Sequence, residues 1–190
     1  LHAKGLLTGI WVPPQDVRDL RTLVAQREKM IAMKTQAKNR LQSTLHRYHI
    51  LPPEGKPFDP DLHTWWLSLP VSKLELVRIK SDLDTLAFSQ QQIASIETCM
   101  AAWAAHDERV ALLFQLTGVG LVTAVTVLAA VGVIQRFPDA DHLVGYSGLG
   151  VRVHDSGLTS RSGGITKAGR RDLRAMLVEA AQTGVIHDPR

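Results

Sequence analysis

Two long stretches free of glycine and proline constrain this chain more than any other feature. One runs from Gln15 to Tyr48 and the other from Val71 to Ala105, and both are rich in strong helix formers. At 1.5 Å per residue the first stretch predicts a rod of roughly 50 Å. Apolar residues recur along both stretches at steps of three and four, with a few polar interruptions, which is typical of helices that pack lengthwise. We therefore expect a mostly α-helical chain with a coiled-coil region over residues 15–106.

The two stretches are separated by a linker over residues 51–70 that contains five prolines. Residues 63–67 are expected to form one turn of helix, in which Trp65 and Trp66 serve as packing anchors. Two rods joined in this way predict either an antiparallel hairpin within one chain or a coiled coil between chains. Sequence does not choose between them, and we expect self-association of the chain through this region, as a homo-oligomer.

The sequence changes character after about Asp107, where glycine becomes frequent and the apolar residues become small and β-branched. This change predicts a small helical domain over residues 107–190. The expected helices cover residues 108–115, 121–131 and 139–146, and a last one is N-capped by Thr166 and runs to about Gln182, with Gly184 as its stop. Residues 148–164 are expected to be loops with short extended pieces.

Composition excludes several classes of protein. The single cysteine, Cys99, leaves no internal disulfide and no CxxC zinc site, and we expect no metal ion bound by these residues and a reducing, cytoplasmic location. Because there is no run of 18 apolar residues, no membrane partner is expected. A formal net charge of +4 is only mildly basic, so nucleic-acid binding depends on where the positive charge lies.

A glycine turn lies between the first two helices of the C-terminal domain. The pattern of a helix, then Leu116-Thr117-Gly118-Val119-Gly120, then a second helix resembles a helix-hairpin-helix. In that motif Gly118 and Gly120 would bring backbone amides to a phosphate without reading sequence. The alternative is a glycine turn that only packs two helices together.

Positive charge is concentrated in the same domain. Six cations fall within 23 positions: Arg152, Arg161, Lys167, Arg170, Arg171 and Arg174. The last four are expected on one face of the last helix, with two of them in its first turn, where cations oppose the helix dipole. This placement predicts a nucleic-acid surface rather than a merely solvated face.

Between these elements lies a serine-rich segment that begins His154-Asp155-Ser156-Gly157. A serine hydroxyl is a poor nucleophile unless a base, a metal or an oxyanion cradle activates it. Adjacent residues of an extended segment point in different directions, so the string of His154, Asp155 and Ser156 is not a triad. The residues alone predict turn-forming serines.

Taken together, the motifs resemble the C-terminal transposase domain of the IS110 group of insertion-sequence transposases, over roughly residues 108–184. The residues that carry the resemblance are Phe114 to Gly120 with Thr123-Ala124, Arg136-Phe137, Tyr146 to Leu149, His154 to Gly157, Ile165 to Gly169, and Leu173 to Ala181. Residues 1–14 resemble the end of the family's RuvC-like nuclease domain.

The resemblance implies a recombinase that cuts and rejoins DNA under the guidance of a structured bridge RNA. Its nuclease domain supplies four acidic residues for Mg²⁺ and its C-terminal domain supplies a serine, which Ser156 matches here. The acidic domain is expected upstream of this chain, so Mg²⁺ is expected only with that domain and the chain alone is expected to be inactive. The alternatives are a non-catalytic module for nucleic-acid binding and oligomerisation, in which Ser156 only shapes a turn, and a structural helical scaffold.

Overall fold

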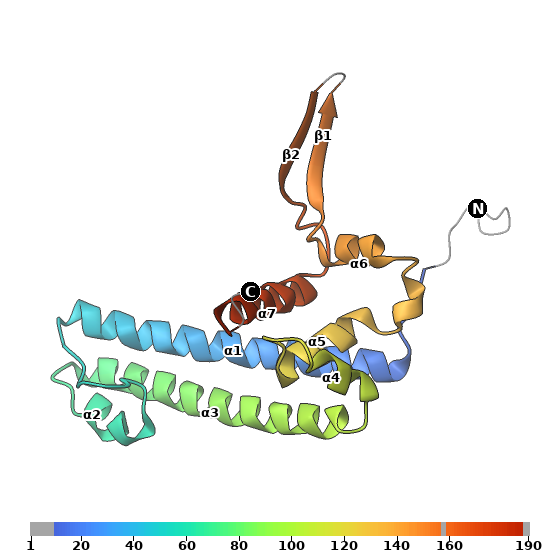
Figure 1. The fold of residues 1–190 in the computed structure, drawn as a ribbon. Coiled ribbons are helices and arrows are strands. Elements are labelled where there is room, and N and C mark those ends of the chain that lie inside the picture. The colour runs from blue at the N-terminus through green and yellow to red at the C-terminus, as the bar shows by residue number, and fades with distance from the viewer. Residues whose placement is uncertain (1–9, 157–158, 188–190) are drawn as a thin grey trace, which may run out of the picture. The chain divides into compact units, whose positions relative to one another are not determined.

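The computed structural model describes residues 10–156 and 159–187, and for residues 153–162 it describes the backbone alone. This part of the chain is mostly helical, as predicted, and contains one two-stranded hairpin (Figure 1). It divides into two compact units. One unit is Ala25–Cys99, and the other consists of the described residues up to Val24 together with those from Met100 onward. The two long helices, α1 (Gln15–Arg47) and α3 (Lys73–Ala104), contribute to both units.

Within Ala25–Cys99, helices α1 and α3 form an antiparallel hairpin. Arg27 Nε donates to Glu97 Oε1 at 2.8 Å, and further along α1 Arg40 Nε donates to Asp82 Oδ1 at 2.7 Å. Because residue numbers rise along α1 as those of their partners on α3 fall, the two helices run in opposite directions. Of the two arrangements that the sequence allows, the structure shows the hairpin within one chain, and self-association stays a prediction.

The linker packs against this hairpin through Trp66. It forms the 3-10 helix η2 (Pro60–Leu62) and the short helix α2 (His63–Leu67). Trp66 is fully buried, its Nε1 donates to Pro57 O at 2.8 Å, and the Phe58 ring stacks on it at 6.1 Å between centroids. Trp65 is partly buried against the same core, so the predicted packing role is confirmed for both tryptophans. The other buried residues of this core are Ala37, Leu41, Leu45, Leu69, Ile79, Leu83 and Leu86.

The second unit is built on the contact between two helices, α5 (Leu121–Val131) and α7 (Arg171–His187), which bury Val125 and Leu173 respectively. Around them lie α4 (Glu108–Leu113), the 3-10 helix η3 (Ile134–Arg136) and α6 (Ala140–Ser147). Asp107 and Asp139 cap α4 and α6 by accepting hydrogen bonds from backbone amides of the first turn. The predicted helices over 108–115, 121–131 and 139–146 are confirmed to within two residues.

The segment expected to be mostly loop forms a β-hairpin instead. Strand β1 (Val151–Ser156) pairs antiparallel with β2 (Thr159–Ile165), and an irregularity in register falls between Val151 and Val153. In Figure 1 this hairpin extends away from α6 and α7. The extended pieces that we predicted are therefore two paired strands.

The prediction for the start of the last helix is wrong. Helix α7 begins at Arg171 rather than directly after a Thr166 cap, because the amides of Thr166 and Lys167 donate to Gly150 O and Gly148 O and continue the hairpin's ladder. Lys167 also has a left-handed backbone, with φ of 56°. The helix passes through Gly184 instead of stopping there. This glycine lies against the turn before α5, where a Cβ on it would lie 3.0 Å from Thr117 O.

Candidate nucleic-acid interface

The two glycines of the turn before α5 have different surroundings. Gly118 has a φ of 90°, and a Cβ added to it would lie 2.7 Å from Gly184 N and closer still to Ala180 O. This contact matches the alternative in which the turn packs helices together. Gly120 has nothing within 4 Å of such a Cβ and precedes α5 without a side-chain cap, so the free amides of the first turn are approachable from its side. The predicted helix-hairpin-helix stays a prediction, and only Gly120 has room for a ligand.

Three of the six predicted phosphate-binding cations make hydrogen bonds within the chain. Arg152 Nη2 donates to Thr166 O at 2.9 Å, and Arg174 Nη1 donates to Ser147 O at 3.1 Å and to Lys167 O at 3.3 Å. Arg170 is paired with Asp172 through two hydrogen bonds. Burial opposes the charge on Asp172, but hydrogen bonds from Arg170 and from the amide of Leu173 outweigh it and lower the pKa of this carboxyl group.

Two other predicted cations are exposed and unpaired within the described part of the chain. Arg171 lies at the first turn of α7 and Lys167 in the loop before it, and neither side chain has a hydrogen-bond or ion-pair partner among the described residues. Lys167 and Arg170 do not lie on the helix, so the single basic face that we predicted for α7 is not formed. Lys167 instead lies at the base of the hairpin, and Arg171 follows four residues later as the first residue of α7.

The predicted nucleophile lies at the far end of that hairpin. Ser156 is the last residue of β1, and its Cα is paired with that of Thr159, the first residue of β2. Arg161 lies opposite His154. The side chains of Ser156 and Arg161, and all of Gly157, lie outside what the structure describes. The backbone alone thus puts Ser156 at the end of β1 that lies farther along the chain from α6.

A set of arginines that sequence reasoning missed gathers at the C-terminal end of α5. Arg21 Nε and Nη2 donate to Ala129 O and Ala130 O at 2.7 and 2.8 Å. Arg136 Nε donates to Val131 O at 2.9 Å and Arg109 Nη1 donates to Gly132 O at 3.0 Å. The last carbonyls of a helix lack partners within it and carry partial negative charge, so these guanidinium groups cap α5. The available signal was an apolar helix end without a polar residue of its own to cap it.

Arg136 also occupies an aromatic cage. Its guanidinium carbon lies 4.3 Å from the centroid of a Trp11 ring, 4.0 Å from that of Phe137 and 4.4 Å from that of Tyr146. Such stacking stabilises a planar cation in a partly buried site. The cage therefore ties the segment before α1 to the residues that follow α5, and it gives Arg136 a structural role.

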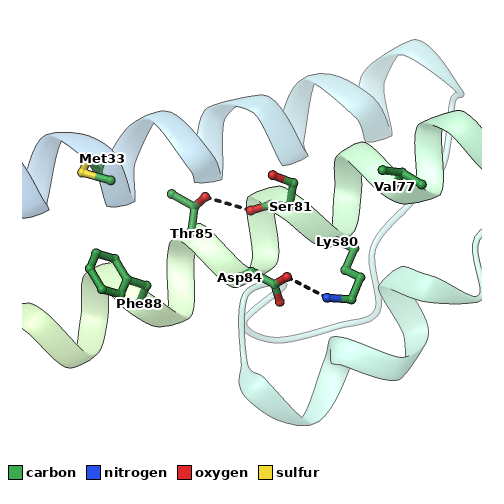
Figure 2. Close-up of a pocket in the computed structure, with 7 residues that line it drawn as sticks. All are labelled: Met33, Val77, Lys80, Ser81, Asp84, Thr85 and Phe88. Atoms are coloured by element: carbon green, nitrogen blue, oxygen red, sulfur yellow. Dashed lines mark hydrogen bonds and ion pairs between the residues drawn. The ribbon is translucent and has the colours of Figure 1, made fainter.

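A groove on the other unit offers no comparable set of groups. Figure 2 shows it between Met33 of α1 and the exposed Val77 and Phe88 of α3. Its charged residues, Lys80 and Asp84, pair with each other at 2.7 Å along α3. Across the described residues, no three histidine, cysteine or acidic side chains are grouped to hold a metal ion, and no helix is apolar over enough length to cross a membrane.

The known proteins that this chain resembles in sequence are named as transposases. The pattern of the Transposase IS116/IS110/IS902 family matches residues 110–190. A putative transposase, y4qE, of Sinorhizobium fredii is 30% identical over 182 residues, which are 94% of this chain and 44% of that protein. The transposase for insertion sequence element IS1111A of Coxiella burnetii is 28% identical over 173 residues, 90% of this chain and 48% of that protein.

A probable family 20 transposase of Pseudomonas aeruginosa is 32% identical over 118 residues, 62% of this chain and 34% of that protein. The chain thus spans less than half the length of each of these relatives. The family match covers α5, α6, the hairpin and α7, which are the elements that carry the candidate interface. Residues 110–190 of this chain belong to the IS116/IS110/IS902 family of transposases.

Proposed function

We propose that this chain is the C-terminal part of a DNA transposase that cuts and rejoins DNA through Ser156. The observation that carries the proposal is the placement of Ser156 at the end of strand β1, with the exposed cations Arg171 and Lys167 following the base of the hairpin. A hairpin of this kind can bring its turn to a DNA strand while the cations contact phosphates along the same duplex. Relatives of this chain are named as transposases, which supports the same class of activity.

The proposed reaction is a transfer of a phosphodiester to serine. The Ser156 hydroxyl oxygen bonds to phosphorus while the bond from phosphorus to one strand's oxygen breaks. The serine proton ends on that leaving oxygen, so the products are a phosphoserine ester and a free strand end. Attack by another strand's hydroxyl reverses these steps and rejoins DNA. Cations held near the phosphate stabilise the charge that develops in both directions.

We further propose that the longer protein is guided by a structured RNA, assembles as a homo-oligomer and holds Mg²⁺ in an acidic domain. Among the described residues, no three histidine, cysteine or acidic side chains are grouped to hold Mg²⁺. We expect Gly120, the exposed Arg171 and Lys167, and Arg161 to contribute phosphate contacts.

Salt dependence of DNA binding tests the interface. The chain should bind duplex DNA of unrelated sequences with similar affinity, and log affinity should fall linearly with log salt at about −0.9 per phosphate contact. Arg171→Ala should reduce that slope by about 0.9, because it removes one phosphate contact. Lys73→Ala, which removes an exposed cation of α3 far along the sequence, is the control and should leave the slope unchanged. An affinity that does not depend on salt would contradict the proposed interface.

A non-catalytic nucleic-acid-binding module is the second candidate, and the exposed cations favour it equally. The two candidates differ in chemistry rather than in binding. A covalent adduct between DNA and the complete transposase, trapped on Ser156, supports the enzyme. Salt-dependent binding with no adduct, under conditions in which the transposase recombines DNA, supports the module.

A further inference from the structure

Backbone hydrogen bonds between the two arms of the β-hairpin continue beyond the ends of its strands. Below the last strand pair, Thr166 N donates to Gly150 O at 2.8 Å and Lys167 N donates to Gly148 O at 3.0 Å. Arg170 N then donates to Tyr146 O at 2.9 Å. The two arms of the hairpin therefore remain joined from the strands down to the last turn of α6 and the first residue before α7.

Two glycines allow these arms to touch. A Cβ on Gly169 would lie 2.5 Å from both Gly148 N and Tyr146 O, and both of these are backbone atoms that cannot rotate away. Gly148 itself has a φ of 74° in the left-handed region and ends α6. A side chain at either position would separate the arms, so the close contact depends on glycine at both.

Arg174 spans the same two arms from α7. Its Nη1 donates to Ser147 O at the end of α6 and to Lys167 O in the opposite arm, at 3.1 and 3.3 Å. The neighbouring residue on α7, Leu173, is 1% exposed and fixes the helix in the core of the unit. Arg174 thus connects both arms of the hairpin to a helix that is firmly packed.

From this geometry we infer that Gly148, Gly169 and Arg174 form a lock that sets the direction in which the hairpin leaves the body of the unit. Arg174 is a positioning residue in this arrangement and not a phosphate ligand. The inference rests on the proposed function in one respect, which is that Ser156 at the end of β1 takes part in the reaction. A hairpin fixed at its base holds its turn in one place, so DNA does not have to order it during binding.

The lock predicts opposite effects for two neighbouring arginines of α7. Arg174→Ala removes the connection between the arms and should at least double the width of the distance distribution between hairpin and helix. Spin labels on Ser160→Cys and Glu179→Cys in a Cys99→Ser background report this distance. Arg171→Ala removes the same charge from an exposed position, and it should leave the width unchanged while lowering the salt slope of DNA binding by about 0.9. Arg174→Ala should leave that slope within about 0.3 of the parent's.

Two glycine substitutions provide a second, independent test. Gly169→Ala should broaden the same distribution, whereas Gly150→Ala, with nothing within 4 Å of its added Cβ, should not. Circular dichroism checks that each variant keeps its helices. If Arg174→Ala loses them, the comparison of Gly169→Ala with Gly150→Ala tests the lock. The lock is overturned if the distributions stay narrow in Arg174→Ala or, where that variant does not fold, in Gly169→Ala. An equal loss of salt slope in Arg174→Ala and Arg171→Ala also overturns it. If the affinity of the unsubstituted chain for DNA did not depend on salt, the proposed interface would be refuted. The distance measurement would still test the lock.

Discussion

Individual arginines in this chain have two uses, and their hydrogen-bond partners distinguish them. Arg21, Arg136 and Arg174 donate to backbone carbonyls of the chain itself, whereas Arg171 extends into solvent. Burial, together with the nearby charges of Arg170 and Arg136, lowers the pKa of Arg21. A guanidinium group that already satisfies carbonyl oxygens has fewer donors left for phosphate. Counting positive charges along the sequence therefore overestimates the DNA-binding surface.

The caged arginine should matter for stability rather than for binding. Arg136→Ala removes a hydrogen bond to a helix end and the stacking on three rings, and we expect a loss of about 2–4 kcal/mol in the free energy of unfolding. Urea denaturation followed by circular dichroism measures it. Arg18→Ala, at an exposed position on α1, is the control and should change stability by less than about 0.5 kcal/mol. An equal effect of both substitutions would show that the cage contributes nothing.

At the scale of elements, the α1 and α3 hairpin contains a polar layer inside its apolar core. Thr44 and Glu75 are buried and bonded to each other, and Arg78 donates to the same Glu75 carboxylate. The hydrogen bond from Arg78 is the main cause that lowers the pKa of Glu75, against the opposing effect of burial. Such a layer favours one alignment of the two helices, because a shift would leave a buried carboxylate without partners.

This layer predicts a pH dependence of stability. The pKa of Glu75 is lower in the folded chain than its unfolded value of about 4.3, so its stabilising contribution is complete above that pH. The contribution is lost as pH falls through the folded pKa. Glu75→Gln should cost on the order of 1–3 kcal/mol at pH 7, and the difference from the parent should shrink towards pH 3. Urea midpoints at both pH values test this, with the exposed Glu54→Gln as control. A difference that grows at low pH would contradict the assignment.

Sequence predicted the helices well because their signals are local. Apolar spacing and the absence of glycine and proline gave α1 and α3 to within two residues, and Gly132 marked the end of α5. Short extended pieces were predicted here but their pairing into a β-hairpin was not, since the second strand contains the serine and glycine run Ser160-Arg161-Ser162-Gly163-Gly164, which has little strand preference. The start of α7 was predicted wrongly because pairing across the hairpin is not visible in the local sequence. Thr166 suits a helix cap, but pairing with Gly150 across the hairpin outweighs that local preference.

At the scale of the whole molecule, the described chain separates a helical hairpin from the unit that carries the family match. The match over residues 110–190 falls within the unit that contains β1, β2 and α7, and Ala25–Cys99 lies outside it. Function is therefore expected to be more sensitive to changes around the β-hairpin than to changes on the exposed surface of α3. The serine motif could be predicted from resemblance alone, because nothing in its composition distinguishes Ser156 from the serines that follow it.

The reaction is best tested in a complete transposase that contains this chain. Ser156→Ala removes the attacking oxygen and keeps the backbone of the hairpin, so strand exchange should fall below detection while DNA binding stays within about twofold. A serine at a hairpin turn contributes less than about 1 kcal/mol to folding, so unfolding would not explain the loss. Ser160→Ala and Ser162→Ala are matched controls in β2, opposite Asp155 and Val153, and both should recombine DNA at the parent's rate. Recombination by Ser156→Ala within a few-fold of the parent, or loss of activity in Ser160→Ala instead, would assign the nucleophile to another residue.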